Sequence, residues 1–219
     1  MSRSRWRRRA ATASSSTCKI TSDGALVVFH DGTLTRACGV PGGIAERTLE
    51  EIRALRLFGT EHGIPLFSEV LSLIGGRVPL IVELKAYGDW RQLCKGVQAL
   101  LDDYNGDACI ESFDPFLVRW FRKNGPDVMR GQLSEAYRYS HKSIPWFLSL
   151  LMSRLLTNAF TRPHFIAYRL GPRCLSARLC TLLGAFRVVW TVHESDDLAV
   201  LQATNDAVIF EHFTPDTTF

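Results

Sequence analysis

The chain has 219 residues, 46% of them hydrophobic and 22% charged, with a mean hydropathy of +0.01. This composition is typical of an ordinary soluble protein with one sizeable core, and it favours a single domain. Six of the 26 basic residues, and no acidic residue, lie in the first 22 positions, which leaves 20 basic against 22 acidic residues. The rest of the chain is therefore slightly acidic, and a general nucleic-acid-binding function loses its support.

The six cysteines form no CxxC pair and have no metal-ligand spacing with histidine. We interpret them as small buried side chains in a reducing compartment, which predicts a cytoplasmic protein. No stretch reaches the roughly 20 apolar residues of a transmembrane helix, so no transmembrane segment is expected.

Residues 1–17 are basic and rich in serine and alanine, but they contain no apolar core of a secretory signal. We expect a disordered or misassigned N-terminal tail here, with an organelle transit peptide as the alternative. The folded domain is expected to span residues 18–219.

Seven short apolar runs predict β-strands, and several are apolar on both faces, as in a parallel sheet. They are residues 26–29, 79–84, 108–112, 128–133, 164–170, 187–192 and 207–211. Helical patterns alternate with them at residues 48–57, 66–74, 89–104, 114–125, 143–160, 174–184 and 195–203.

Local signals support several helix ends. Thr48 and Glu51 form a capping-box pattern, Asp89 is a candidate N-cap and Gly125 is a candidate C-cap. Strand-helix alternation over about six units predicts a parallel sheet with helical crossovers. A closed barrel explains so many units in one domain better than an open sheet does.

In a parallel barrel, catalytic side chains lie at the C-terminal ends of the strands. The first predicted strand ends in His30, and the second ends in Glu83 and Lys85, whose spacing of two places both on one face. The sixth contains Trp190. Each has an ordinary explanation as well: a histidine bonded to a loop, a strand-end ion pair and a core aromatic. Together they could serve acid catalysis, a divalent cation and an anionic substrate.

The sequence blocks that carry these residues resemble the glycerophosphodiester phosphodiesterase family. The blocks are TSDGALVVFHDGTLTR, GIPLFSEVL, LIVELK, VVWTV and DAVIFE, and their order and spacing also match. The resemblance covers roughly residues 19–216. It implies an α/β fold, a (β/α)8 TIM-type barrel, that hydrolyses glycerophosphodiesters to an alcohol and glycerol phosphate in lipid metabolism.

The resemblance also implies roles for individual residues. His30 is similar to the family's second histidine, which protonates the leaving alkoxide. Glu83 corresponds to the third carboxylate that binds a divalent cation, calcium or magnesium. Lys85 corresponds to the lysine that neutralises phosphate charge, and Trp190 to the aromatic that lines the glycerol side of the pocket.

The N-terminal part departs from the family pattern. The family's first strand ends in His-Arg-Gly, and its second carries Glu-x-Asp; aligned on the TSDG turn, Ser15 and Thr17 stand at the two acidic positions. We therefore expect a barrel that lacks its first strand and most of its second, with an incomplete cation site. An incorrect start or a frameshift would explain this departure.

Three functions follow. The first is hydrolysis of a small-molecule glycerophosphodiester. The second is a non-catalytic barrel, a pseudoenzyme, that binds a phosphate-bearing ligand or a partner. The third is a weak membrane-surface contact through the arginine-rich residues 3–9 and the apolar residues 144–156.

Overall fold

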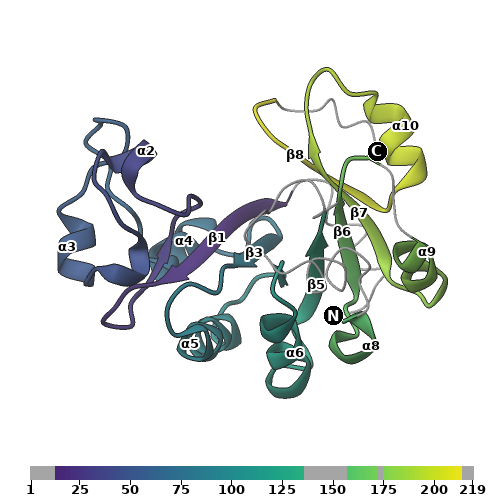
Figure 1. Cartoon of the computed structure of the whole chain (residues 1–219), viewed down its shortest axis with the longest axis horizontal. Coiled ribbons are helices and arrows are strands. Elements are labelled where there is room, and N and C mark those ends of the chain that lie inside the picture. The colour runs from purple at the N-terminus through teal and green to yellow at the C-terminus, as the bar shows by residue number, and fades with distance from the viewer. Residues whose placement is uncertain (1–12, 136–156, 172–174, 214–219) are drawn as a thin grey trace. The chain divides into compact units, whose positions relative to one another are not determined.

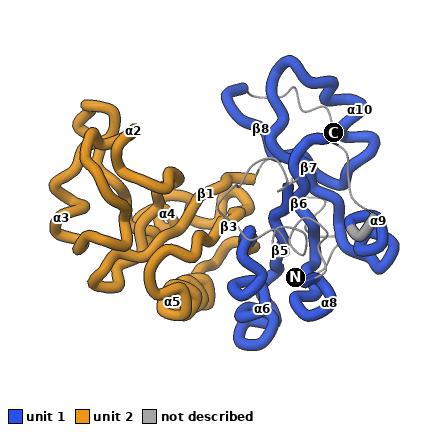
Figure 2. The backbone as a smooth tube through the Cα atoms, in the orientation of Figure 1, with its two compact units in different colours: residues 1–11, 111–219 blue, residues 12–110 orange. Residues whose placement is uncertain are grey.

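The structure is a computed structural model, and it describes residues 13–135, 157–171 and 175–213 (Figure 1). The strand order is β2-β1-β3-β4-β5-β6-β7-β8, so that from β3 onward each strand follows its predecessor in the chain. The chain divides into two compact units, one of residues 12–110 and one of residues 111–219 with 1–11 (Figure 2).

The unit of residues 12–110 contains three complete strands and the start of a fourth. Its strands are β1 (Ser14–Ile20), β2 (Leu26–Val28) and β3 (Leu80–Leu84), and β4 (Ala108–Ser112) begins in it. Its helices are α2 (Thr35–Cys38), the short 3-10 helix η1 (Ile44–Glu46), α3 (Leu49–Arg53), α4 (Phe67–Ile74) and α5 (Trp90–Asp102). The expected capping box at Thr48 and the expected N-cap at Asp89 are both confirmed.

Strand β1 is longer than the sequence led us to expect. It begins at Ser14, inside the segment that we assigned to the tail, and runs parallel to β3 with Thr17 beside Glu83. The polar side chains of Thr17, Lys19 and Thr21 alternate with apolar Cys18 and Ile20, and all five residues are buried. Because its serines and threonines are polar, the strand does not stand out as an apolar run.

Strand β2 corrects our expectation that His30 follows a parallel strand. It pairs antiparallel with β1, with Cys18 beside Val28, through a turn in which the Thr21 amide donates to the Ala25 carbonyl at 2.9 Å. Gly24 supplies a φ of 90° in this turn, a conformation that favours glycine. So short a turn can join only antiparallel strands, because a parallel pair needs a crossover of a dozen or more residues.

The unit of residues 111–219 contains the other strands in parallel order. They are β5 (Met129–Ser134), β6 (Phe165–Arg169), β7 (Phe186–Val192) and β8 (Ala207–Phe210), and β4 ends in it. Its helices are α6 (Pro115–Asn124), α8 (Asn158–Thr161), α9 (Leu175–Leu182) and α10 (Leu198–Thr204). The C-cap at Gly125 is confirmed. The predicted helix of residues 143–160 and the apolar stretch 144–156 lie largely outside the described residues.

The seven predicted strands are all present. The described cysteines are thiols and not disulfides: Cys18, Cys38, Cys94, Cys109 and Cys180. Burial raises the pKa of the Cys18 thiol above its ordinary value. Within the part of the chain that the structure describes, no helix is both long and apolar enough to cross a membrane.

Candidate active site

The β1–β2 hairpin carries His30 back along β1 to the level of Glu83. The amide of Phe29 donates to the carbonyl of Thr17 at 2.9 Å, and Thr17 in turn lies beside Glu83 in the β1–β3 pairing. The hairpin therefore places the loop of residues 29–34, which we call the histidine loop, next to the end of β3. It does so although β2, which leads into this loop, runs antiparallel to β1.

Glu83 is a buried carboxylate with two partners. Its Oε2 accepts a hydrogen bond from the Thr17 hydroxyl at 2.7 Å, and it lies 3.6 Å from the Lys85 ammonium. Glu83 is only 8% exposed, so an unpaired charge here would cost several kcal/mol. The hydroxyl and the ammonium together offset that cost.

Lys85 joins the end of β3 to the histidine loop. Its Nζ donates to the backbone carbonyl of His30 at 2.8 Å, while its side chain stays 20% exposed. The ordinary ion pair that the spacing of Glu83 and Lys85 allowed is thus present, and it is connected to His30. The structure brings these three predicted residues together within residues 12–110.

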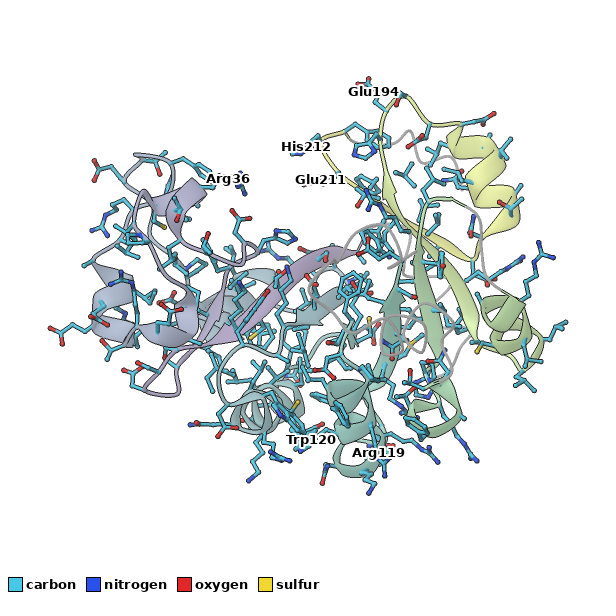
Figure 3. All side chains as sticks on the ribbon, in the orientation of Figure 1. Arg36, Arg119, Trp120, Glu194, Glu211 and His212 are labelled. Carbon is cyan, nitrogen blue, oxygen red and sulfur yellow. The ribbon has the colours of Figure 1, made fainter. Side chains whose placement is uncertain are left out.

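The His30 side chain is exposed and faces a carboxylate on one side. Its Nδ1 lies 3.3 Å from Asp31 Oδ1, and both oxygens of Asp31 accept hydrogen bonds from Arg36, at 2.6 and 2.9 Å. Arg36, on α2, is labelled in Figure 3. The bond from Arg36 lowers the pKa of Asp31 to about 2, with a further contribution from His30. With Nδ1 turned towards Asp31, Nε2 is the ring nitrogen that remains for a substrate oxygen.

Lys19 is also a member of this cluster, although by sequence it is one of the six basic residues in the first 22 positions. It is 1% exposed, and its ammonium donates to the backbone carbonyl of Asp31. It also lies over the rings of Phe29 and Tyr87, at 5.4 and 4.9 Å from their centroids. Burial and, next, the charge of Lys85 lower the pKa of Lys19 to about 8. The period-two series Thr17, Lys19, Thr21 was the signal that could have revealed it.

The residues present do not fit the divalent cation that the family resemblance implies. Within the described residues, no three histidines, cysteines or carboxylates come close enough together to hold a metal ion. Positions 15 and 17 of β1 are hydroxyl residues, and the two carboxylates of the cluster already have basic partners, Glu83 with Lys85 and Asp31 with Arg36. Hard dications prefer several carboxylate oxygens, which this cluster does not supply.

Trp190 lies in the other unit, on β7. Its indole Nε1 donates to the Ala167 carbonyl at 3.0 Å, and its ring meets the ring of Phe113 edge-on, with 5.5 Å between centroids. The side chain is half-buried, so part of the ring is exposed. A role in lining the glycerol side of a pocket stays a prediction.

Comparison with known proteins identifies the family of the chain. Residues 18–217 match the model of the glycerophosphoryl diester phosphodiesterase family. The chain belongs to that family. A phosphodiesterase of this family from Caldanaerobacter subterraneus subsp. tengcongensis is 28% identical over 206 residues, which cover 87% of this chain and 78% of that protein.

Solved structures of other phosphodiesterases have the same fold. The structure of a glycerophosphoryl diester phosphodiesterase from Silicibacter pomeroyi is 24% identical, with a TM-score of 0.69 over 90% of this chain and 79% of that one. A phosphodiesterase from Oleispira antarctica, solved with the product sn-glycerol-3-phosphate, is 17% identical, with a TM-score of 0.74 over 93% of this chain and 83% of that one. The expected TIM-like α/β fold is thereby confirmed.

Proposed function

We propose that the chain binds glycerophosphodiesters and hydrolyses them to an alcohol and glycerol phosphate, with His30 as the general acid. Family membership supports the substrate class. The observation that carries the proposal is the His30 side chain: it is exposed, and its Nδ1 faces a carboxylate that Arg36 fixes in place. That arrangement orients the ring through Nδ1 and leaves Nε2 open to solvent.

The proton balance of the reaction defines what His30 would do. The oxygen of a water molecule attacks phosphorus and its proton passes to the solvent, while the bond to the leaving alcohol breaks and the alcohol oxygen takes up a proton from Nε2. Solvent then returns a proton to Nε2. Asp31 orients the ring through its contact with Nδ1, and Lys85 holds the backbone of the same loop through the His30 carbonyl. Positioned acids of this kind contribute about 10²- to 10⁴-fold to a rate.

The alternative function is binding without turnover, and it concerns the general base that hydrolysis would need in addition to His30. Among the described residues 13–110, His62 is the one other histidine, and the side-chain hydrogen bonds and ion pairs of His30, Glu83 and Lys85 join them to Asp31, to Thr17 and to one another. A general base is therefore not evident beside the general acid, and a pseudoenzyme that retains a phosphate-bearing ligand is the alternative.

Hydrolysis of glycerophosphocholine tests the proposal directly. We expect release of choline by the full chain and a loss of about 10²-fold or more in kcat for His30→Ala. His62→Ala is the matched control, because His62 is also exposed and lies in the same unit. Both variants should still bind sn-glycerol 3-phosphate. Absence of choline release, with glycerol phosphate binding intact, would favour the pseudoenzyme.

A further inference from the structure

Lys19 is a permanent part of the site that no family role explains, and its surroundings are those of a cation-binding pocket. A backbone carbonyl and the faces of two aromatic rings surround its ammonium. These groups offset part of the cost of removing the positive charge from water. Lys19 is only 1% exposed, and its ammonium contacts the histidine loop at the Asp31 carbonyl.

Lys19 and Lys85 hold two successive peptide groups. The ammonium of Lys85 donates to the carbonyl of His30, and the ammonium of Lys19 donates to the next carbonyl, that of Asp31. The two charges are close enough for Lys85 to lower the pKa of Lys19. The loop that presents His30 is therefore anchored on a pair of positive charges.

The charge balance of the cluster is already positive. Lys19, Lys85 and Arg36 are basic, whereas Glu83 and Asp31 are the acidic partners. Exchanging two carboxylates for the hydroxyls at positions 15 and 17 removes two negative charges, which equals the charge that a dication would have neutralised. A dication placed beside Glu83 would instead be repelled by the Lys85 ammonium, which lies 3.6 Å from that carboxylate, and by the charge of Lys19.

We infer that the buried ammonium of Lys19 supplies, from within the protein, the positive charge that a divalent cation supplies in a carboxylate-lined phosphodiesterase site, so that the chain binds a phosphate ester without a metal ion. Lys19 is a positioning residue: it holds the loop and raises the local potential, while Lys85, which is more exposed, faces the ligand. The inference deepens the proposed function and rests on it for the identity of the ligand.

Calorimetric titration of the full chain with sn-glycerol 3-phosphate tests the inference. The dissociation constant should be the same, within about twofold, in excess EDTA and in excess Ca²⁺ or Mg²⁺. Lys19→Met keeps the length of the side chain but removes its charge, and it should weaken binding about tenfold or more, the value of one charge-assisted interaction. Lys19→Arg should retain most of the affinity.

Two controls separate charge from structure. Lys95→Met removes an equal charge from the exposed face of α5 in the same unit and should leave the affinity unchanged. The loss in Lys19→Met should be larger for doubly charged glycerol phosphate than for singly charged glycerophosphocholine, a difference that mere loosening of the loop would not produce. A circular-dichroism melt verifies that the variant is folded.

The outcomes are distinct from those of the proposed function. Binding that disappears in EDTA, or equal losses in Lys19→Met for both ligands, would overturn the inference even if glycerophosphocholine is hydrolysed. Metal-independent, Lys19-dependent binding without choline release would uphold the inference and refute hydrolysis. The metal comparison uses the native chain, so it decides the question even if Lys19→Met does not fold.

Discussion

Lys19 introduces a pH dependence into folding, because its environment disfavours the charged form. Burial and the charge of Lys85 lower its pKa to about 8, against the opposing effect of Glu83 and Asp31. A lysine in the unfolded chain keeps its proton up to a pH of about 10.4. Between about pH 8 and 10.4 the unfolded state thus binds more protons, and the free energy of unfolding rises with pH in that window.

Replacement of Lys19 by methionine should remove this rise. At pH 7 the variant should be as stable as the native chain or more stable, by up to about 2 kcal/mol, because a buried charge is exchanged for an apolar side chain of similar length. Urea unfolding at intervals from pH 7 to 10 measures both effects. Parallel stability profiles of the two proteins would contradict this account of Lys19.

The Asp31–Arg36 pair gives a prediction at acid pH. Asp31 is held at a pKa of about 2 mainly by its bond to Arg36, so its stabilising effect is present above the ordinary carboxyl pKa and is lost as the pH falls through about 2. In Arg36→Gln the Asp31 carboxyl should titrate closer to its ordinary pKa, which carbon NMR of the side chain can follow.

The cost of Arg36→Gln in stability at neutral pH should be below about 1 kcal/mol, because the guanidinium is largely exposed. The kcat for hydrolysis should fall although the free energy of unfolding changes little, because Asp31 loses the bond that orients it towards His30. An unchanged Asp31 titration would show that the bidentate bond does not form in solution.

At the scale of elements, the sequence predicted the seven strands that contain apolar runs but not β1. Periodicity identifies a strand by its buried apolar residues, and β1 buries Thr17, Lys19 and Thr21 instead. The direction of β2 was also missed, because a run of apolar residues carries no information on which way its neighbour runs. The turn at Thr21–Ala25 held that information.

The candidate site was also predictable only in part from the sequence. His30, Glu83 and Lys85 lie in motifs with specific spacing, and the structure brings them together. Lys19 and Arg36 depend on contacts between elements far apart in the chain or on the fold of a loop, so residue type and spacing do not reveal them. A lysine near a basic N-terminus is ordinarily a solvated side chain.

The register of β1 leads to a test by reconstruction. Thr17 lies beside Glu83, and Ser15 is two residues earlier on the strand. Ser15→Glu with Thr17→Asp would place carboxylates at the two positions that the family resemblance assigns to the cation. Combined with Lys19→Met, this exchange should create a Ca²⁺ site, detected as a rise in melting temperature on addition of Ca²⁺.

The double variant that retains Lys19 is the matched control. The ammonium should repel the cation and reduce the Ca²⁺-dependent rise. An equal rise in both proteins would show that Lys19 does not exclude a dication, and no rise in either would show that the register of β1 is not the one described here.

At the scale of the whole molecule, the contacts of the lysine pair belong to one compact unit. His30, Glu83, Lys85, Lys19 and Arg36 all lie within residues 12–110 (Figure 2). Inorganic phosphate should therefore slow amide hydrogen exchange in residues 28–33 and 83–87, and it should have no effect on the described strands β5–β8. Protection centred on β6 or β7 would place the anion site elsewhere.

The reactivity of the Cys18 thiol can be used to measure how often β1 detaches from the sheet. Cys18 lies between Thr17 and Lys19, its side chain is completely buried, and its raised pKa keeps it protonated. An alkylating reagent reacts with thiolates, so it can modify Cys18 only in molecules whose β1 has detached from the sheet. The rate of that reaction, read by mass spectrometry of the peptide, measures how often the strand that carries the internal cation opens.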